Sequence, residues 1–242
     1  MRQHHNGKLR DGPQAPIWLK TQRARTKLVA SVCEGLKESF GKPRLGNPRD
    51  PVDDLIFLTL SNRTQIETAR SVFKSLKAAG SWDSVSRLPV RVLERKIQIA
   101  GLAKRRSRQI KRALRRIAMD FGSCKLDALR GWKEARAHQY LAALPGVSDK
   151  VAKCVMMYTL GFRVLPVDIH VFRVSSRLGW TSRCRADQCH DDLESLVPPE
   201  SRYAYHVGCI CLGRTVCTPA QPKCAACPIR AFCVYFKETT RE

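Results

Sequence analysis

The stretch LPGVSDKVAKCVMMYTLGFRVLPVDIH, residues 144–170, decides the fold that this sequence predicts. Its first four residues, Leu-Pro-Gly-Val, cannot continue a helix, because proline lacks the amide donor and Gly146 tolerates positive φ. Ser148 then has the position of an N-cap for an apolar helix, and Asp168 has the same position before a second helix. The pattern predicts helices joined by a turn whose backbone N–H groups can bind an anion.

Lys150 and Asp168 are the side chains of this stretch that can carry chemistry. Lys150 lies in the first turn of its helix, where the helix dipole disfavours an ammonium and so favours a neutral, nucleophilic amine. The residues alone leave two interpretations open. The pair is either a nucleophile with a carboxylate partner, or a solvated lysine and an ordinary helix cap.

Composition points to a polyanionic partner. The chain has 242 residues, with 44 Lys and Arg against 21 Asp and Glu, which gives a formal net charge of +23. Such an excess repels itself unless a polyanion neutralises it, and nucleic acid is favoured over an anionic membrane surface because the bases are spread along the whole chain. No apolar run is long enough for a membrane span, and no secretory signal is expected at the N-terminus.

A strongly basic helix is predicted after Gly101-Leu102, with Ile110, Leu114, Ile117 and Phe121 on its apolar face. An ordinary surface helix mixes charges of both signs, whereas this segment is expected to carry eight bases and no acid on its polar side. The sequence therefore favours a face that follows phosphates, with an ordinary charged face as the alternative. Its eight bases are Lys104, Arg105, Arg106, Arg108, Lys111, Arg112, Arg115 and Arg116.

The remaining chain also predicts helices, and no strand alternation is sustained, so the fold class is all-α. Residues 1–16 have the composition of a basic flexible tail, and residues 45–51 form a linker of turn residues. Thr64 with Glu67 has the spacing of a capping box. The other predicted helices lie within residues 17–40, 53–60, 64–79, 89–99, 132–143, 169–178, 187–196 and 201–214.

Four of the eleven cysteines form the spacing C-x6-C-x2-C-x5-C. An odd number of cysteines without a signal peptide argues against a disulfide framework and for thiolate ligands in a reducing compartment. So compact a set favours an iron–sulfur cluster over zinc, which takes two well-separated pairs. The four are Cys217, Cys224, Cys227 and Cys233. The other seven are expected to be buried, inert thiols: Cys33, Cys124, Cys154, Cys184, Cys189, Cys209 and Cys211.

With these motifs assembled, residues 45–235 resemble the endonuclease III family of helix-hairpin-helix DNA glycosylases. The resemblance rests on LGNPRDPVDDLIFLTLS, LPGVSDKVA, PVDIHVFRV, and LGRTVC leading into the cysteine spacing. It implies a two-domain fold with a DNA cleft between a six-helix barrel and an iron–sulfur cluster domain. The implied division is a tail at 1–16, N-terminal helices at 17–50 that pack with the C-terminal domain, a barrel with the hairpin at 51–162, and a cluster domain at 163–242.

The resemblance also implies roles for individual residues. Lys150 would attack the sugar C1′ and form a Schiff base, Asp168 would stabilise the cationic sugar, and β-elimination would then nick the strand. The four cysteines would hold a [4Fe–4S] cluster. Asp149, and Ser148 in place of the family's second glycine, depart from the family pattern, as does Arg63 in place of its gap-filling glutamine. The implied DNA contacts are Gly146, Ser148, Arg63, Gln65, His170, Arg105, Arg106 and Arg108.

The function expected from the sequence is a bifunctional DNA glycosylase and abasic-site lyase that removes oxidised pyrimidines. The partner expected for the protein is double-stranded DNA with damaged bases or abasic sites. The protein is expected to be a monomer and not to bind a membrane. Its location would be the cytoplasm, at the nucleoid, in a bacterium, and the nucleus in a eukaryote. The alternatives are a glycosylase of the same fold for mismatched or alkylated bases, a non-catalytic damage-binding iron–sulfur protein, and an electron carrier, which would leave the charge unexplained.

Overall fold

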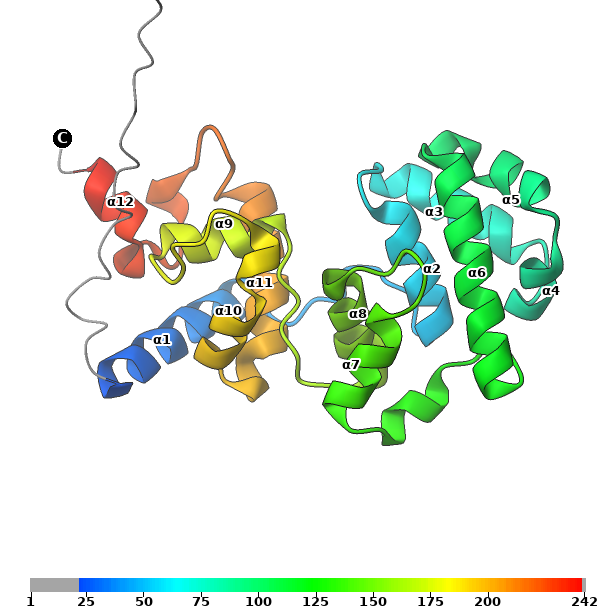
Figure 1. The fold of residues 1–242 in the computed structure, drawn as a ribbon. Coiled ribbons are helices and arrows are strands. Elements are labelled where there is room, and N and C mark those ends of the chain that lie inside the picture. Colours follow the sequence, from blue (N-terminus) through cyan, green and yellow to red (C-terminus); the bar gives the residue numbers. More distant parts are fainter. Residues whose placement is uncertain (1–21, 241–242) are drawn as a thin grey trace, which may run out of the picture. The chain divides into compact units, whose positions relative to one another are not determined.

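A computed structural model describes residues 22–240, and every regular element in that range is a helix (Figure 1). This confirms the all-α prediction for the described residues. The predicted tail and the start of the first predicted helix lie outside them. The described residues divide into two compact units, one of residues 44–166 and one that joins residues 22–43 to residues 167–240. The sequence placed the corresponding boundaries at residues 50 and 162.

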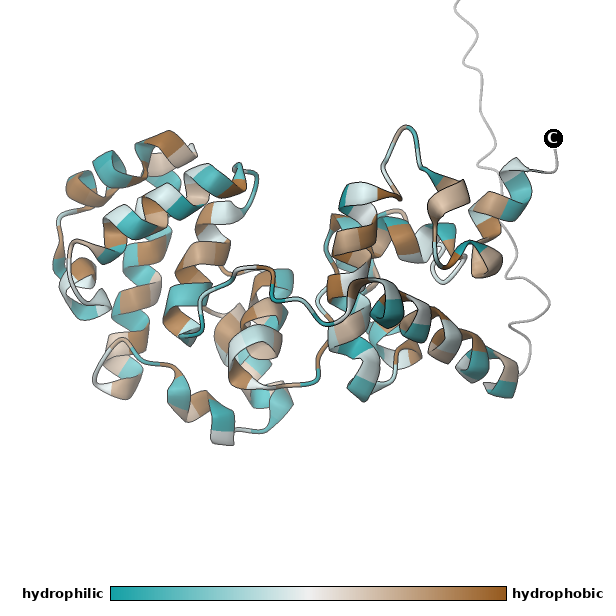
Figure 2. Cartoon of the chain, turned by 180° about the vertical axis from the view of Figure 1, so that it is seen from behind, coloured by the Kyte–Doolittle hydropathy of each residue, from teal (hydrophilic) through white to brown (hydrophobic). Residues whose placement is uncertain are grey.

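The unit of residues 44–166 is a group of helices around an apolar core that includes Leu55, Leu93 and Leu114, all at most 1% exposed. Figure 2 shows hydrophobic and hydrophilic residues in alternating bands along the helices, as expected where one face of each is buried. Its helices are α2 (Pro51–Ser61), α3 (Ile66–Lys77), α4 (Trp82–Arg87), α5 (Val90–Ile97), α6 (Ala103–Phe121), α7 (Glu134–Ala142) and α8 (Asp149–Val155), with short helical turns at Gln98–Ala100, Asp127–Gly131 and Met156–Leu160.

Helix α2 begins two residues earlier than the sequence predicted. Asp50 is its N-cap and accepts hydrogen bonds from the amides of Val52 and Asp53, both at 2.9 Å. Pro51 occupies the first helical position, where its missing amide costs nothing. The capping box predicted at Thr64 and Glu67 is wrong, because α3 begins at Ile66 without a side-chain cap.

The other unit contains α1 (Gln22–Phe40), which packs against α11 (Arg202–Thr215), and α11 also packs against α9 (Ile169–Arg177). The core here includes an indole of Trp180 stacked on Tyr205, with ring centroids 5.3 Å apart. The hydroxyl of Tyr205 lies 2.7 Å from that of Ser175. The remaining helices are α10 (His190–Leu196) and α12 (Val234–Thr239), with short turns at Ala186–Gln188, Pro199–Ser201, Cys224–Ala226 and Arg230–Phe232.

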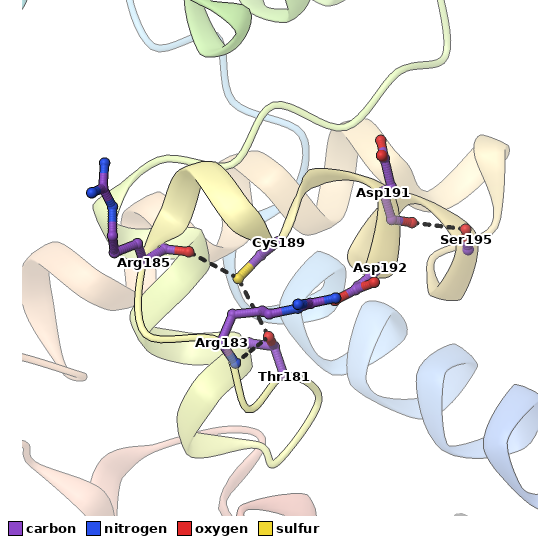
Figure 3. A network of polar contacts seen from close by, with 7 residues as sticks. All are labelled: Thr181, Arg183, Arg185, Cys189, Asp191, Asp192 and Ser195. Atoms are coloured by element: carbon purple, nitrogen blue, oxygen red, sulfur yellow. Dashed lines mark hydrogen bonds and ion pairs between the residues drawn. The ribbon is translucent and has the colours of Figure 1, made fainter.

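A small polar network holds the segment between α9 and α10 (Figure 3). The thiol of Cys189 donates to the carbonyl of Arg185 at 3.2 Å and lies 3.3 Å from the hydroxyl of Thr181. Arg183 pairs with Asp192 at 3.0 Å. Burial raises the pKa of the Cys189 thiol, so this cysteine stays protonated and serves the local structure. No helix within residues 22–240 has the length and apolar character needed to cross a membrane.

Candidate functional site

The turn between α7 and α8 has the geometry that its sequence predicts. Gly146 has φ of +85°, and a Cβ built there would lie 2.8 Å from side-chain atoms of Gln109 on α6. Glycine is therefore required both by the backbone conformation and by the close approach of α6. Ser148 caps α8 by accepting a hydrogen bond from the amide of Val151 at 3.4 Å.

Lys150 lies in the first turn of α8 and is half-buried. Helix α8 is fixed by a continuous buried run from Val151 to Val155, so the lysine projects from a rigid element. The departure at Asp149 has a local explanation. Its Oδ1 lies 2.5 Å from Nε2 of His138 on α7, so this carboxylate ties the two helices of the hairpin together.

A second carboxyl, which the sequence did not single out, is associated with Lys150 in the same unit. Asp54 on α2 is 0% exposed, and α2 packs against α8. Burial raises the pKa of Asp54 to about 7, while a hydrogen bond from Asn47 and the charges of Lys150 and Arg44 lower it. The burial of Asp54 could not be predicted from its neighbours in the sequence. The only unusual feature there is two adjacent acids, Asp53 and Asp54, at the start of an apolar helix.

Asp168 belongs to the other unit and is the N-cap of α9, as predicted. Its Oδ1 accepts hydrogen bonds from the amides of His170 at 2.9 Å and Val171 at 2.8 Å. His170, expected at the DNA, is half-buried. Its Nδ1 lies 3.1 Å from a guanidinium nitrogen of Arg173. A Cβ built at Gly213 would lie 2.6 Å from Nδ1 of His170. Desolvation by burial lowers the pKa of His170. The ring packs against Gly213 of α11, which gives it a structural role in this unit.

Two neighbouring loops carry the non-glycine residues of positive φ in the described chain: Arg63 at 57° and Leu102 at 52°. Leu102 is 60% exposed. The prediction that Arg106 contacts DNA is wrong, because this residue is 5% exposed and ties the loops together. Its guanidinium donates to the carbonyls of Asn62 and Ala100 and to the hydroxyl of Thr64.

Strained backbone of this kind is found at binding sites, where the surrounding structure maintains it. Arg63 and Gln65, both named from the sequence, are exposed beside Leu102's loop. Leu102 itself was missed. The signal that could have identified it is an apolar residue that follows a glycine and precedes a run of bases.

The basic face of α6 is smaller than the sequence suggested. Lys111 is 8% exposed and donates to the carbonyl of Leu88, so it is a structural residue. Arg116 forms a 2.6 Å ion pair with Asp120 one turn later, so the helix is not free of acids. The bases that remain exposed with no ion pair to an acid among the described residues are Lys104, Arg105, Arg108, Arg112 and Arg115.

The four spaced cysteines line one cavity in the unit that contains α9 and α12, together with Arg177 and Tyr235. Burial and the charges of the three other cysteines together raise the pKa of Cys227 to about 11, against the opposing effect of a backbone hydrogen bond from Ile229. Four cysteine sulfurs around one cavity are a donor set that a metal cluster would bind in the thiolate form. Within residues 22–240, no three His, Cys, Asp or Glu side chains converge as one metal ion requires.

Hydrogen-bond donors around these sulfurs fit a thiolate-bound cluster. Arg177 donates to Sγ of Cys217 at 3.1 Å, and backbone amides hydrogen-bond the sulfurs of Cys227 and Cys233. Such donors stabilise the anionic form of a ligand. Of the other seven cysteines, five are buried as predicted, Cys211 is half-buried, and Cys184 is exposed, which contradicts the expectation for that residue.

Comparison with known proteins identifies the class. Residues 56–199 match the HhH-GPD superfamily base excision DNA repair protein family. This match spans more than half of the chain, and the chain therefore belongs to that family of base-excision DNA glycosylases.

Individual relatives are similar at modest identity. The chain is 27% identical over 202 residues to Endonuclease III of Thermotoga maritima, which covers 81% of this chain and 88% of that protein. It is 28% identical over 181 residues to Protein ROS1A of Oryza sativa subsp. japonica, covering 67% of this chain and 9% of that one. With the DNA glycosylase/AP lyase ROS1 of Arabidopsis thaliana it shares 27% over 173 residues, 64% of this chain and 12% of that one. The chain thus spans about a tenth of the length of these plant relatives.

Solved structures show the same fold. A non-covalent Endonuclease III–DNA complex aligns with a TM-score of 0.76 at 25% identity, covering 90% of this chain and 99% of that one. A thermostable thymine-DNA glycosylase aligns with a TM-score of 0.72 at 22% identity, covering 88% and 97%. The endonuclease III-like fold expected from the sequence is therefore confirmed.

Proposed function

We propose that this protein is a bifunctional DNA glycosylase and abasic-site lyase whose nucleophile is Lys150. The observation that carries the proposal is the placement of this lysine in the first turn of α8, half-buried and fixed by the buried residues that follow it. A non-catalytic DNA-binding protein has no need of an amine held this way. Two similar proteins, Endonuclease III of Thermotoga maritima and the DNA glycosylase/AP lyase ROS1 of Arabidopsis thaliana, support the same reaction class by their names.

The proposed reaction begins when the damaged nucleotide leaves the base stack, since its glycosidic bond is otherwise inaccessible. The neutral Nζ of Lys150 bonds to C1′, and the electron pair of the glycosidic bond leaves with the base. Nζ then loses a proton, its electron pair forms the C=N bond of a Schiff base, and the C1′–O4′ bond breaks as O4′ takes up a proton, which opens the sugar ring. This acidifies C2′, so loss of a C2′ proton expels the 3′ phosphate and nicks the strand.

Asp168 supplies negative charge for the cationic sugar in this scheme. Two backbone amides of α9 hold its Oδ1, so its orientation is set by the helix that it caps. The amides of Gly146 and Ser148 in the exposed turn would bind a phosphate. Arg63 and Leu102 would enter the gap left by the extruded base, as apolar and cationic wedges do in minor-groove complexes.

The cysteine-lined cavity is proposed to hold a [4Fe–4S] cluster on Cys217, Cys224, Cys227 and Cys233. When bound, the cluster supplies the positive centre that four adjacent thiolates require. Iron analysis and the visible absorbance of the anaerobically purified protein test this assignment. If the purified protein contains one zinc ion per chain and no iron, the four cysteines form a zinc site and the cluster assignment is wrong.

The proposed substrate class is oxidised pyrimidines in duplex DNA. Arg63 is the reason to test mismatched and alkylated bases as well. Its guanidinium can pair with the orphan base differently from the glutamine amide of the family. A panel of duplexes with one defined lesion each, including mismatched and alkylated bases, decides which range applies. If only mismatched bases are released, the protein is a mismatch-specific glycosylase of the same fold and the proposed substrate class is wrong.

Covalent trapping with borohydride tests the proposed chemistry directly. Wild-type protein should become linked to lesion-containing and abasic duplex, and Lys150→Ala should abolish the linkage while still binding DNA. Lys125→Ala is the matched control, because Lys125 is exposed in the same unit and lies outside the hairpin. Base release without any trapped complex in wild type would leave a glycosylase without lyase activity. Lesion binding with neither base release nor trapping would leave a non-catalytic binding protein.

A further inference from the structure

Asp54 is a buried carboxyl with only one of its two oxygens hydrogen-bonded within the described residues. It is 0% exposed on α2, and its Oδ1 accepts a hydrogen bond from Nδ2 of Asn47 at 2.7 Å. Its other oxygen, Oδ2, is buried and has no hydrogen-bond partner in the part of the chain that the structure describes. A buried acceptor without a partner is costly, and natural structures keep few of them without a functional reason.

The charges that act on Asp54 come from two elements. Lys150 on α8 and Arg44 in the segment before α2 both favour its ionised form. The neighbouring acid, Asp53, is engaged elsewhere, because it accepts hydrogen bonds from Lys77 on α3 at 2.9 Å and from the indole of Trp82 at 2.5 Å. Asp54 and Lys150 belong to the same unit and lie on helices α2 and α8, which pack against each other.

Burial dominates the titration of this acid. It raises the pKa of Asp54 from 3.8 to about 7, although Asn47, Lys150 and Arg44 all act in the opposite direction. A proton acceptor is most effective when it titrates near the working pH, because it is then both ionised and basic enough to hold a proton. An ordinary surface aspartate is always ionised at neutral pH and is a poor acceptor.

We propose that Asp54 is the proton acceptor of Lys150, an inference that rests on the proposed Schiff-base reaction. As Nζ bonds to C1′ it becomes positively charged and must lose a proton before the sugar ring opens. In the proposed step an N–H bond of Lys150 breaks and an O–H bond forms on Oδ2 of Asp54. The positive charge on nitrogen and the negative charge on the carboxylate cancel together, so no net charge is created in the buried site.

This role differs from that of Asp168. Asp168 caps a helix with its carboxylate and would face the sugar, whereas Asp54 acts only through Lys150 and is a positioning residue. The competing explanation is that Asp54 merely anchors the segment around Asn47 to α2. That explanation predicts that any loss of trapping rate on replacing Asp54 is the same at every pH and does not follow the ionisation of its carboxyl.

The test compares the single-turnover rate of borohydride trapping on an abasic duplex, across about pH 5.5 to 9, for wild type, Asp54→Asn and Asp54→Glu. Protonation of Lys150 itself slows every variant at low pH, so the informative quantity is the ratio of wild-type rate to variant rate. For Asp54→Asn this ratio should be near one at low pH, rise through about pH 7, and level at roughly 10²-fold.

Asp54→Glu keeps a carboxyl and should retain the rise in smaller amplitude. Asp127→Asn is the matched control, because Asp127 is an exposed acid of the same unit whose ion pair is with Arg130. Its ratio should stay near one at every pH. Thermal unfolding of each protein verifies that it is folded at the assay temperature.

The outcomes separate this inference from the proposed function. If wild type is trapped, Lys150→Ala is not, and the Asp54→Asn ratio is independent of pH, Asp54 is a structural anchor and the inference fails alone. If wild type is never trapped, the Schiff-base function fails first. Should Asp54→Asn not fold, the wild-type profile and Asp54→Glu decide, and a wild-type rate without a limb near pH 7 overturns the inference.

Discussion

Replacing Asp54 by asparagine should stabilise the protein at neutral and alkaline pH, although the residue is fully buried. Burial raises the pKa of its carboxyl from 3.8 to about 7. The folded protein therefore holds a proton on Asp54 more tightly than the unfolded chain does. The contribution of Asp54 to the free energy of unfolding consequently falls as pH rises from about 3.8 and reaches its minimum just above about 7.

The magnitude follows from the same difference. About three pKa units at about 1.4 kcal/mol each give about 4 kcal/mol as the cost of ionised Asp54 near pH 8. Asparagine has nearly the same volume, carries no charge, and its carbonyl oxygen can still accept the hydrogen bond of Asn47. Its amide would replace Oδ2, which already lacks a partner. We therefore expect a gain of about 2–4 kcal/mol near pH 8 and less than about 1 kcal/mol near pH 3.5.

Native-state hydrogen exchange of the α2 amides measures this effect in the unit that contains Asp54. Urea unfolding of the full chain at several pH values supplies an independent value of the free energy. Asp127→Asn is again the control, because its carboxyl is exposed and its replacement removes no buried charge. A difference between Asp54→Asn and wild type that stays constant from about pH 3.5 to pH 8 would refute the assignment of a raised pKa.

Two further predictions concern arginines of α6 in the same unit. Arg106→Met should lower the free energy of unfolding by about 2–4 kcal/mol, because the carbonyls of Asn62 and Ala100 lose a buried donor; urea unfolding measures this, and an unchanged midpoint would contradict it. Arg108→Ala should leave stability unchanged and reduce the salt dependence of DNA affinity by about one charge, whereas Arg116→Ala, already paired with Asp120, should reduce it less. Equal slopes for Arg108→Ala and wild type would remove Arg108 from the phosphate contacts.

The parts of the site that the sequence predicted are those set by local signals. A Pro-Gly turn, a serine cap and an aspartate cap act within four residues, so the roles of Gly146, Ser148 and Asp168 follow from their immediate neighbours in the chain. The spacing of the four cysteines is similarly local, and they line one cavity. Helix boundaries moved by one to a few residues where an unrecognised cap such as Asp50 started the helix earlier.

The parts that the sequence could not predict depend on which elements pack together. Arg106 and Lys111 have the pattern of bases on an exposed face, yet the loops and α5 around α6 bury them and supply carbonyl acceptors. Thr64 has a capping-box spacing but bonds to Ala100, thirty-six residues away. Asp54 carried no signal, because only the packing of α2 against α8 gives this acid its burial and its lysine neighbour.

One variant can therefore distinguish function from structure at Asp54 without reference to DNA contacts. If the acid is only a structural anchor, Asp54→Asn should still gain stability above about pH 7, because its amide oxygen keeps the hydrogen bond from Asn47, but any loss of rate should be the same at every pH. If burial of an ionisable carboxyl serves proton transfer, stability and rate should move in opposite directions, since removing the charge relieves the fold and removes the acceptor together. The two quantities should also share one pH dependence, because both follow the ionisation of the same buried carboxyl near pH 7.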